Sequence, residues 1–193
     1  MGRMPLLPGT DLTVSDLCLG GNVFGWTADE PTSHAVLDRF VDAVPSTQSP
    51  FVDTAEMYGD GRSEQILGGW MAERGLRDRM VVATKASPGR KEHPLSATEI
   101  EAAAERSLRN LQTDRIDLYY AHYDDESTPL EETLTAFDAL VRSGKVRHVA
   151  ASKKRSSTAH DVGSSAVQPK TLPPRHRSLT VRSVEGSCGM APR

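Results

Sequence analysis

Short apolar runs alternate with stretches whose apolar residues recur at helical spacing. The runs predict strands at 17–21, 51–55, 80–85, 116–122 and 146–152, and the stretches between them predict helices at 29–44, 63–75, 96–111 and 129–142. From residue 51 onward, the strands begin about 30 residues apart, which is the period of a βαβ unit. The pattern therefore predicts an α/β fold with a parallel sheet.

Local signals sharpen the element boundaries. Asp29 followed by Pro31 indicates a helix start, and Ser96 with Glu99 three residues later predicts a capping box. The polar stretch 45–50, with a proline at each end, predicts a loop.

The number of units limits the architecture. The pattern supplies five strands and four helices before it stops, whereas a complete eight-fold barrel takes about 250 residues and rarely fewer than about 200. The chain of 193 residues therefore predicts either a small open α/β sheet or the front part of a barrel.

Composition excludes several classes of protein. With 37% hydrophobic and 25% charged residues, the chain can bury a globular core, and no apolar run approaches the ~20 residues of a membrane span. The start of the chain lacks a signal-peptide pattern, and Cys18 and Cys188 lie too far apart in sequence to suggest a disulfide framework. We expect a soluble cytoplasmic protein with free thiols. The net charge of −3 argues against nucleic acid as the main partner.

The charge is unevenly distributed. Residues 153–193 hold eight of the 23 Lys and Arg residues and two of the 26 Asp and Glu residues, so they carry +6 against −9 for residues 1–152. This tail is rich in Ser, Arg and Pro, lacks aromatic residues and has no sustained period, which is typical of disorder. We divide the chain into an α/β part, 1–152, and a basic tail, 153–193.

Four polar residues lie where functional groups of parallel α/β folds gather, at the carboxyl ends of strands. They are Asp53, Lys85, His122 and, just past a strand, Tyr58. An ammonium beside a tyrosine lowers the pKa of the phenol, and a neutral imidazole can hydrogen-bond a carbonyl oxygen. Each residue also has a structural interpretation: a turn for Asp53, a surface ion pair for Lys85, a rim histidine for His122 and a loop aromatic for Tyr58.

Several ordered motifs resemble the aldo-keto reductase family. The segment from Asp53 to Glu64 resembles the signature D-T-A-x-x-Y-G-x-G-x-S-E, and Ala83-Thr84-Lys85 resembles the family's lysine strand. Segments 107–119 and 144–152 resemble the family's third helix with its fourth strand, and the approach to its fifth strand. The resemblance implies an incomplete (β/α)8 TIM barrel of about four and a half units.

The resemblance also implies a chemistry, NADPH-dependent reduction of aldehydes and ketones to alcohols by hydride transfer. Tyr58 matches the general acid, Lys85 the residue that lowers its pKa, Asp53 the partner of that lysine, and His122 the residue that orients the substrate carbonyl.

Cofactor contacts are implied in the same way. Gly21 and Asn22 fall where the first loop borders the family's site, Asp53 adjoins it, and Ser152 matches the first residue of a Ser-Asn pair that holds the nicotinamide carboxamide. Trp26 is expected to line the pocket. No residue set suggests a metal site.

The resemblance stops after Ser152, where Lys153 replaces the expected Asn. The tail is then a basic binding arm, a linker or, as the hypothesis we prefer, the product of a reading-frame shift near codon 153. A half barrel would expose two sheet edges and is expected to self-associate. The alternative to an active reductase is a truncated or frame-shifted family fragment without catalytic activity.

Overall fold

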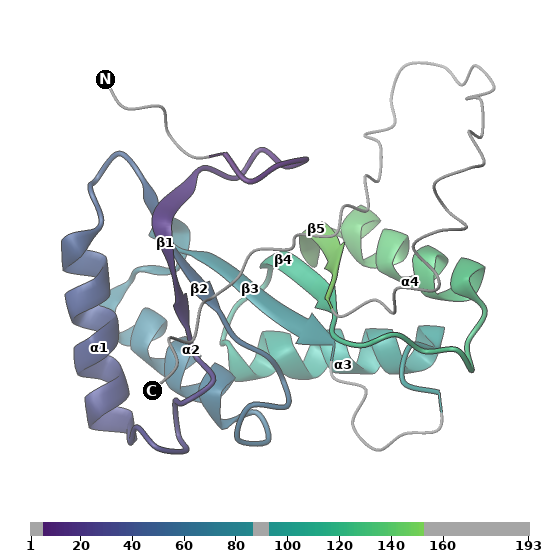
Figure 1. The fold of residues 1–193 in the computed structure, drawn as a ribbon, viewed down its shortest axis with the longest axis horizontal. Helices are drawn as coiled ribbons and strands as arrows, with labels where there is room; N and C mark the ends of the chain where they lie inside the picture. The colour runs from purple at the N-terminus through teal and green to yellow at the C-terminus, as the bar shows by residue number, and fades with distance from the viewer. Residues whose placement is uncertain (1–5, 87–92, 153–193) are drawn as a thin grey trace, which may run out of the picture.

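The computed structural model describes residues 6–86 and 93–152, and the predicted disorder of 153–193 lies outside them. Strands and helices alternate strictly (Figure 1). Their bounds are β1 Val14–Gly20, α1 Glu30–Ala43, β2 Ser49–Asp53, α2 Arg62–Arg74, a 3-10 turn η1 Arg77–Arg79, β3 Val81–Ala86, α3 Ala97–Asn110, β4 Ile116–Ala121, α4 Leu130–Arg142 and β5 Val146–Ala151. The predicted order of elements is confirmed.

The five strands form one parallel sheet in chain order, β1-β2-β3-β4-β5. Each helix connects two neighbouring parallel strands, as a βαβ crossover requires. The register pairs Gly20 with Asp53, and Lys85 with Tyr120. The predicted parallel α/β sheet is therefore confirmed, and all carboxyl ends lie at one edge of it.

The two faces of the sheet pack differently. One face meets the helices in a large core, whose members include Leu37, Val52, Trp70, Ile100 and Phe137. Among the described residues, the other face carries a smaller cluster to which the strands and residues 7–14 contribute and the helices do not: Leu12, Val14, Phe51, Val81, Ala83 and Leu118, with Leu7, Tyr120 and Ala150 at its margin. In a barrel, this second face would be the interior.

Two predicted boundaries need correction. Asp29 caps α1 as expected and accepts a hydrogen bond from the Thr32 N–H at 2.9 Å, but Ser96 makes no side-chain cap at α3. The Ala97 N–H at the start of α3 donates to Glu132 Oε1 of α4 at 2.9 Å. The predicted loop 45–50 is shorter than expected, since β2 already begins at Ser49.

Residues 6–13 cross the amino ends of the strands. Leu6 and Thr13 form an antiparallel bridge, and Leu12 joins the inner cluster, so the segment covers one end of the inner face. None of the helices in the described ranges combines the length and apolar character that a membrane span needs.

Candidate active site

Three of the predicted catalytic residues come together because β2, β3 and β4 are neighbours and end at the same edge. Asp53 is the last residue of β2, Lys85 lies near the end of β3, and His122 follows β4. The Lys85 Nζ donates to Asp53 Oδ2 at 2.7 Å and to the Thr54 carbonyl at 2.8 Å. The nearly buried ammonium is thus paired and hydrogen-bonded, as a buried charge requires.

Tyr58 reaches the same place from the loop that follows β2. The centre of its ring lies 5.1 Å from Lys85 Nζ and 6.1 Å from the centre of the His122 ring, which it meets edge-on at 87°. Gly59 and Gly61 have φ of 58° and 86°, so the sharp return of the loop into α2 uses the left-handed conformation that glycine adopts readily. The structure therefore brings all four predicted catalytic residues together.

Side chains of the signature hold this loop in position. Thr54 Oγ1 and Ser63 Oγ are 2.8 Å apart, and Ser63 Oγ donates to the Gly21 carbonyl at 2.7 Å. The Gly21 N–H donates to the Asp53 carbonyl at 2.8 Å. A Cβ on Gly21 would lie 3.0 Å from Ser63 Oγ, so the bare backbone of this glycine lets the β1 loop approach.

The last signature residue, Glu64, lies fully buried below the loop. It accepts hydrogen bonds from Thr84 Oγ1 at 2.6 Å and from Asn110 Nδ2 at 3.0 Å. Burial raises the pKa of this carboxyl above its ordinary value, against the effect of those hydrogen bonds. Glu64 thus joins α2, β3 and α3 behind the strand that carries Lys85.

Two opposing effects act on the pKa of the Asp53 carboxyl at this edge. Burial raises the pKa of Asp53 above its ordinary value, although the neighbouring Lys85 ammonium opposes that shift. The side chain of Asp53 is 32% exposed, against 8% for Lys85, so the carboxylate is the accessible member of the pair.

One neighbour of the site was missed from the sequence. Tyr120 lies directly across from Lys85 in the register, and its ring centre is 5.9 Å from the Lys85 Nζ. Burial, and then the nearby Asp53 charge, raise the pKa of Tyr120 to about 12. Strand alternation carried the signal, because Tyr120 precedes His122 by two residues and so points to the same face.

Asp53, one of the predicted cofactor residues, belongs to the cluster of four, and the others, Gly21, Asn22 and Ser152, lie around the same edge. Asn22 is exposed in the loop after β1, and Ser152 follows β5, where its N–H donates to the Ala121 carbonyl at 2.8 Å. Trp26 is 76% exposed, and no described contact brings it to the four residues. Across the described parts of the chain, no cluster of three His, Cys, Asp or Glu side chains could hold a metal ion.

Comparison with known proteins adds a family to this geometry. The model of the aldo/keto reductase family matches residues 16–183, a range that continues past the boundary predicted at 152. An uncharacterised oxidoreductase of Bacillus subtilis, YrpG, is 39% identical over an alignment of 156 residues that covers 74% of this chain and 47% of that protein. The NADP(+) aryl-alcohol dehydrogenase of Phanerodontia chrysosporium is 35% identical over 168 residues, covering 76% and 43%.

Solved structures agree in fold. The holo form of an aldo-keto reductase from Bacillus halodurans, AKR11C1, superposes with a TM-score of 0.66 at 32% identity, covering 79% of this chain and 50% of that one. An aldo/keto reductase of Klebsiella pneumoniae solved with NADP and acetate gives a TM-score of 0.64 at 31% identity over the same shares. The chain spans about half the length of the relatives it matches.

Proposed function

The chain belongs to the aldo/keto reductase family, and on that premise we propose that it reduces aldehydes or ketones to alcohols with NADPH, with Tyr58 as the general acid. One observation carries the proposal. The Lys85 ammonium lies between the carboxylate of Asp53, at 2.7 Å, and the ring of Tyr58, at 5.1 Å, at the carboxyl edge of a parallel sheet.

Each side chain has a distinct part in the proposed reaction. The positive charge of Lys85 stabilises the phenolate that Tyr58 becomes as its proton passes to the carbonyl oxygen. Asp53 and the Thr54 carbonyl hold that ammonium in place through two hydrogen bonds. His122 lies against Tyr58 and can donate a hydrogen bond to the same carbonyl oxygen, which orients the substrate.

NADPH, when bound, supplies the hydride that adds to the carbonyl carbon. The proposed contacts concern its nicotinamide end, and they come from Asn22, Asp53 and Ser152, with Gly21 shaping the loop. The fit is supported by accessible polar groups at this edge, namely the exposed Asn22 and the part-exposed Asp53. These residues would orient the ring beside Tyr58, because hydride transfer depends on close positioning.

The test separates binding from chemistry. NADPH is titrated by fluorescence against the whole chain, and carbonyl reduction is then compared between the unaltered protein, Tyr58→Phe and Tyr123→Phe. Loss of the general acid is expected to lower kcat by about 10²- to 10⁴-fold with NADPH binding retained. Tyr123→Phe makes the same chemical change at a tyrosine whose hydroxyl contacts Met57 Sδ, and we expect activity within a few-fold of the unaltered protein.

The NADPH titration also tests the alternative that the chain is a family fragment without catalytic activity. Absence of NADPH binding at millimolar concentration would identify the chain as a family member without catalysis of its own. Equal activity in Tyr58→Phe and the unaltered protein would instead overturn the role of Tyr58.

Self-association through the two outer strands is a further part of the proposal. Strands β1 and β5 each pair with one neighbour in the described sheet, and β1 presents Leu17 with 74% exposure. Unpaired edges favour pairing with another chain. Sedimentation should therefore show dimers or larger species whose fraction grows with concentration, and a compact monomer at all concentrations would contradict it.

A further inference from the structure

The Lys85 ammonium has two kinds of neighbours. Two hydrogen bonds, to Asp53 and to the Thr54 carbonyl, use part of its donor capacity. Two aromatic rings also lie within 6 Å of it, with centres at 5.1 Å for Tyr58 and 5.9 Å for Tyr120. Only the first of these rings has a place in the proposed reaction.

The position of Tyr120 follows from the sheet itself. In the parallel register, Lys85 of β3 lies directly beside Tyr120 of β4, so the two side chains leave the same face as lateral neighbours. Tyr120 also borders the small cluster on the inner face, which includes Phe51, Ala83 and Leu118. The Tyr120 ring is therefore held by the strand that carries it and by packing against this cluster.

We infer that Tyr120 is a positioning residue for the proposed reduction: its ring helps to hold the Lys85 ammonium charged and in place beside Tyr58. An aromatic ring attracts a cation through its quadrupole, and the attraction grows as water is removed. The nearly buried Lys85 meets that condition. The relevance of this inference to catalysis rests on the proposed function. The contact between the Tyr120 ring and Lys85 is independent of it.

Other ionisable groups around Lys85 and Tyr120 come from three further places in the fold. Asp53 ends β2, Tyr58 lies in the following loop with His122 against it, and Cys18 of β1 is near enough to affect Tyr120. A substitution at Tyr120 leaves all of these ionisable side chains in the protein. A difference between Tyr120→Phe and Tyr120→Leu then reports on the ring, because leucine keeps apolar bulk but has no π face.

Competitive acetylation measures the charge on Lys85 directly. Limiting acetic anhydride labels neutral amines, and mass spectrometry follows the labelling of Lys85 relative to Lys145 as pH rises. In Tyr120→Leu, the midpoint of the Lys85 curve should move to lower pH, by roughly two- to tenfold in the acid dissociation constant. In Tyr120→Phe, the midpoint should stay within twofold of the unaltered protein.

The midpoint and the plateau of the labelling curve distinguish loss of the interaction between the ring and the Lys85 ammonium from greater exposure of Lys85. A merely structural role would expose Lys85, which raises the plateau of labelling and leaves the midpoint in place. Unchanged midpoints in both variants, or equal shifts in both, would overturn the inference. Circular dichroism verifies that each variant folds, and Tyr120→Met replaces the leucine variant if that one does not.

The assay needs neither NADPH nor a carbonyl compound. Failure of the proposed function would therefore leave the labelling result intact, and the reverse holds as well. If the reductase assay succeeds, Tyr120→Leu should lower kcat more than Tyr120→Phe and shift the alkaline limb of the pH profile in the same direction as the labelling midpoint.

Discussion

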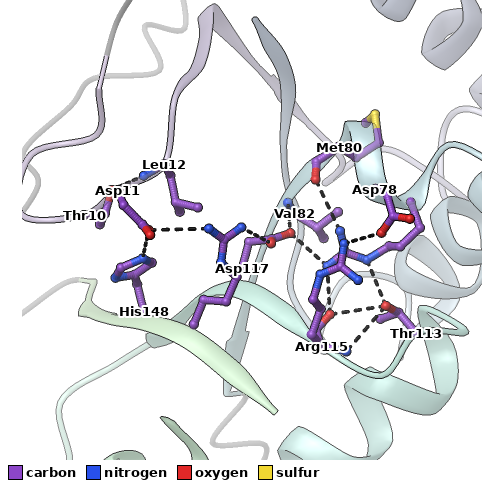
Figure 2. A network of polar contacts seen from close by, with 12 residues as sticks. Thr10, Asp11, Leu12, Asp78, Met80, Val82, Thr113, Arg115, Asp117 and His148 are labelled. Carbon is purple, nitrogen blue, oxygen red and sulfur yellow. Dashed lines mark hydrogen bonds and ion pairs between the residues drawn. The ribbon is translucent and has the colours of Figure 1, made fainter. Parts of the chain in front are cut away.

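Each end of the sheet holds an ion pair between a carboxylate and a cationic side chain, and the two carboxylates differ in their exposure to solvent. At the carboxyl end, Lys85 pairs with Asp53 at 2.7 Å. At the amino end, Asp117 pairs with Arg77 at 2.8 Å and with Arg147 at 3.1 Å (Figure 2). Both pairs lie where a buried charge needs a partner.

The carboxylate at the centre of the amino-end network is inaccessible, although Asp78, Asp11 and Arg147 at its margins are exposed. The side chain of Asp117 is 1% exposed, and it also accepts a hydrogen bond from the Val82 N–H at 3.0 Å. Arg77 donates further to the carbonyls of Met80 and Arg115 and to Thr113. These contacts join η1, β3, β4 and the loop before β4, so the network stabilises the packing of these elements.

The carboxyl end is less completely bonded. Asp53 is 32% exposed, so its carboxylate can be reached by solvent or by a bound molecule. A fully coordinated pair stabilises the fold, whereas a partly open one leaves groups available for chemistry. The following predictions test that difference.

The same substitution at the two cations should have unequal effects on stability. Arg77→Met removes one of the two cations that contact the fully buried Asp117, while Arg147 and the Val82 N–H remain, and it should lower the free energy of unfolding by about 2–3 kcal/mol. Lys85→Met should cost about 1 kcal/mol or less, because the part-exposed Asp53 can take up water or a proton. Urea unfolding of both variants measures the two values, and equal losses would remove the distinction between the ends.

A pair of adjacent glycines tests how rigidly the amino-end loop is held. A Cβ on Gly68 would lie 2.5 Å from the Asn110 carbonyl oxygen, just before the loop that brings Thr113 into the network. We expect Gly68→Ala to destabilise the protein by about 1–3 kcal/mol.

Gly69→Ala is the matched control within the same helix. Its Cβ would meet only Gln112 Nε2, at 3.8 Å, so the better helix propensity of alanine should stabilise the protein by up to about 1 kcal/mol. The melting temperatures of the two variants should therefore move in opposite directions. A shared direction would show that α2 does not pack rigidly on the 110–111 segment.

The smallest expected effect is a difference in pH dependence. At the amino end, a hydrogen bond with His148 lowers the pKa of Asp11 below its ordinary value, so its stabilisation is present above about pH 4 and is lost as pH falls through the lowered pKa. At the carboxyl end, the raised pKa of Asp53 has the opposite sign, and its contribution falls as pH rises from about 4 through that pKa.

Urea unfolding at pH values from about 3 to 7, the range in which carboxyl groups titrate, measures how the free energy of unfolding changes with pH. Asp11→Asn should remove less than about 1 kcal/mol of the rise with pH, as for an exposed ion pair. Asp53→Asn should make the rise steeper, and changes in slope of the same sign in the two variants, each relative to the unaltered protein, would contradict the assignment.

Local pattern determined much of the fold in advance. The period of apolar runs predicted each β-strand and α-helix that the structure describes, though not the 3-10 turn η1, because amphipathic spacing is a local property. Asp29 was recognisable as a cap for the same reason. The Ser96 side chain does not form the predicted cap, and the Ala97 N–H beside it donates to Glu132 of α4, a contact that the local sequence does not contain.

The candidate site was predicted in its members and only partly in its contacts. Asp53, Tyr58, Lys85 and His122 were identified from strand ends and from the signature, and the structure brings them together. Tyr120 was missed, because alternation gives the face of a strand but not the residue that lies beside it. The cofactor contacts assigned to Gly21, Asn22, Asp53 and Ser152 stay predictions.

The sequence by itself determined the order of elements, the parallel connection and the chemical types at the strand ends, since each depends on residues near one another in the chain. Only the tertiary structure decided the register that places Tyr120 beside Lys85. It also decided the amino-end network, where Asp11 meets His148 across 137 positions of the chain. Such contacts depend on how separate strands align and on which buried charges find partners, and no local pattern contains that information.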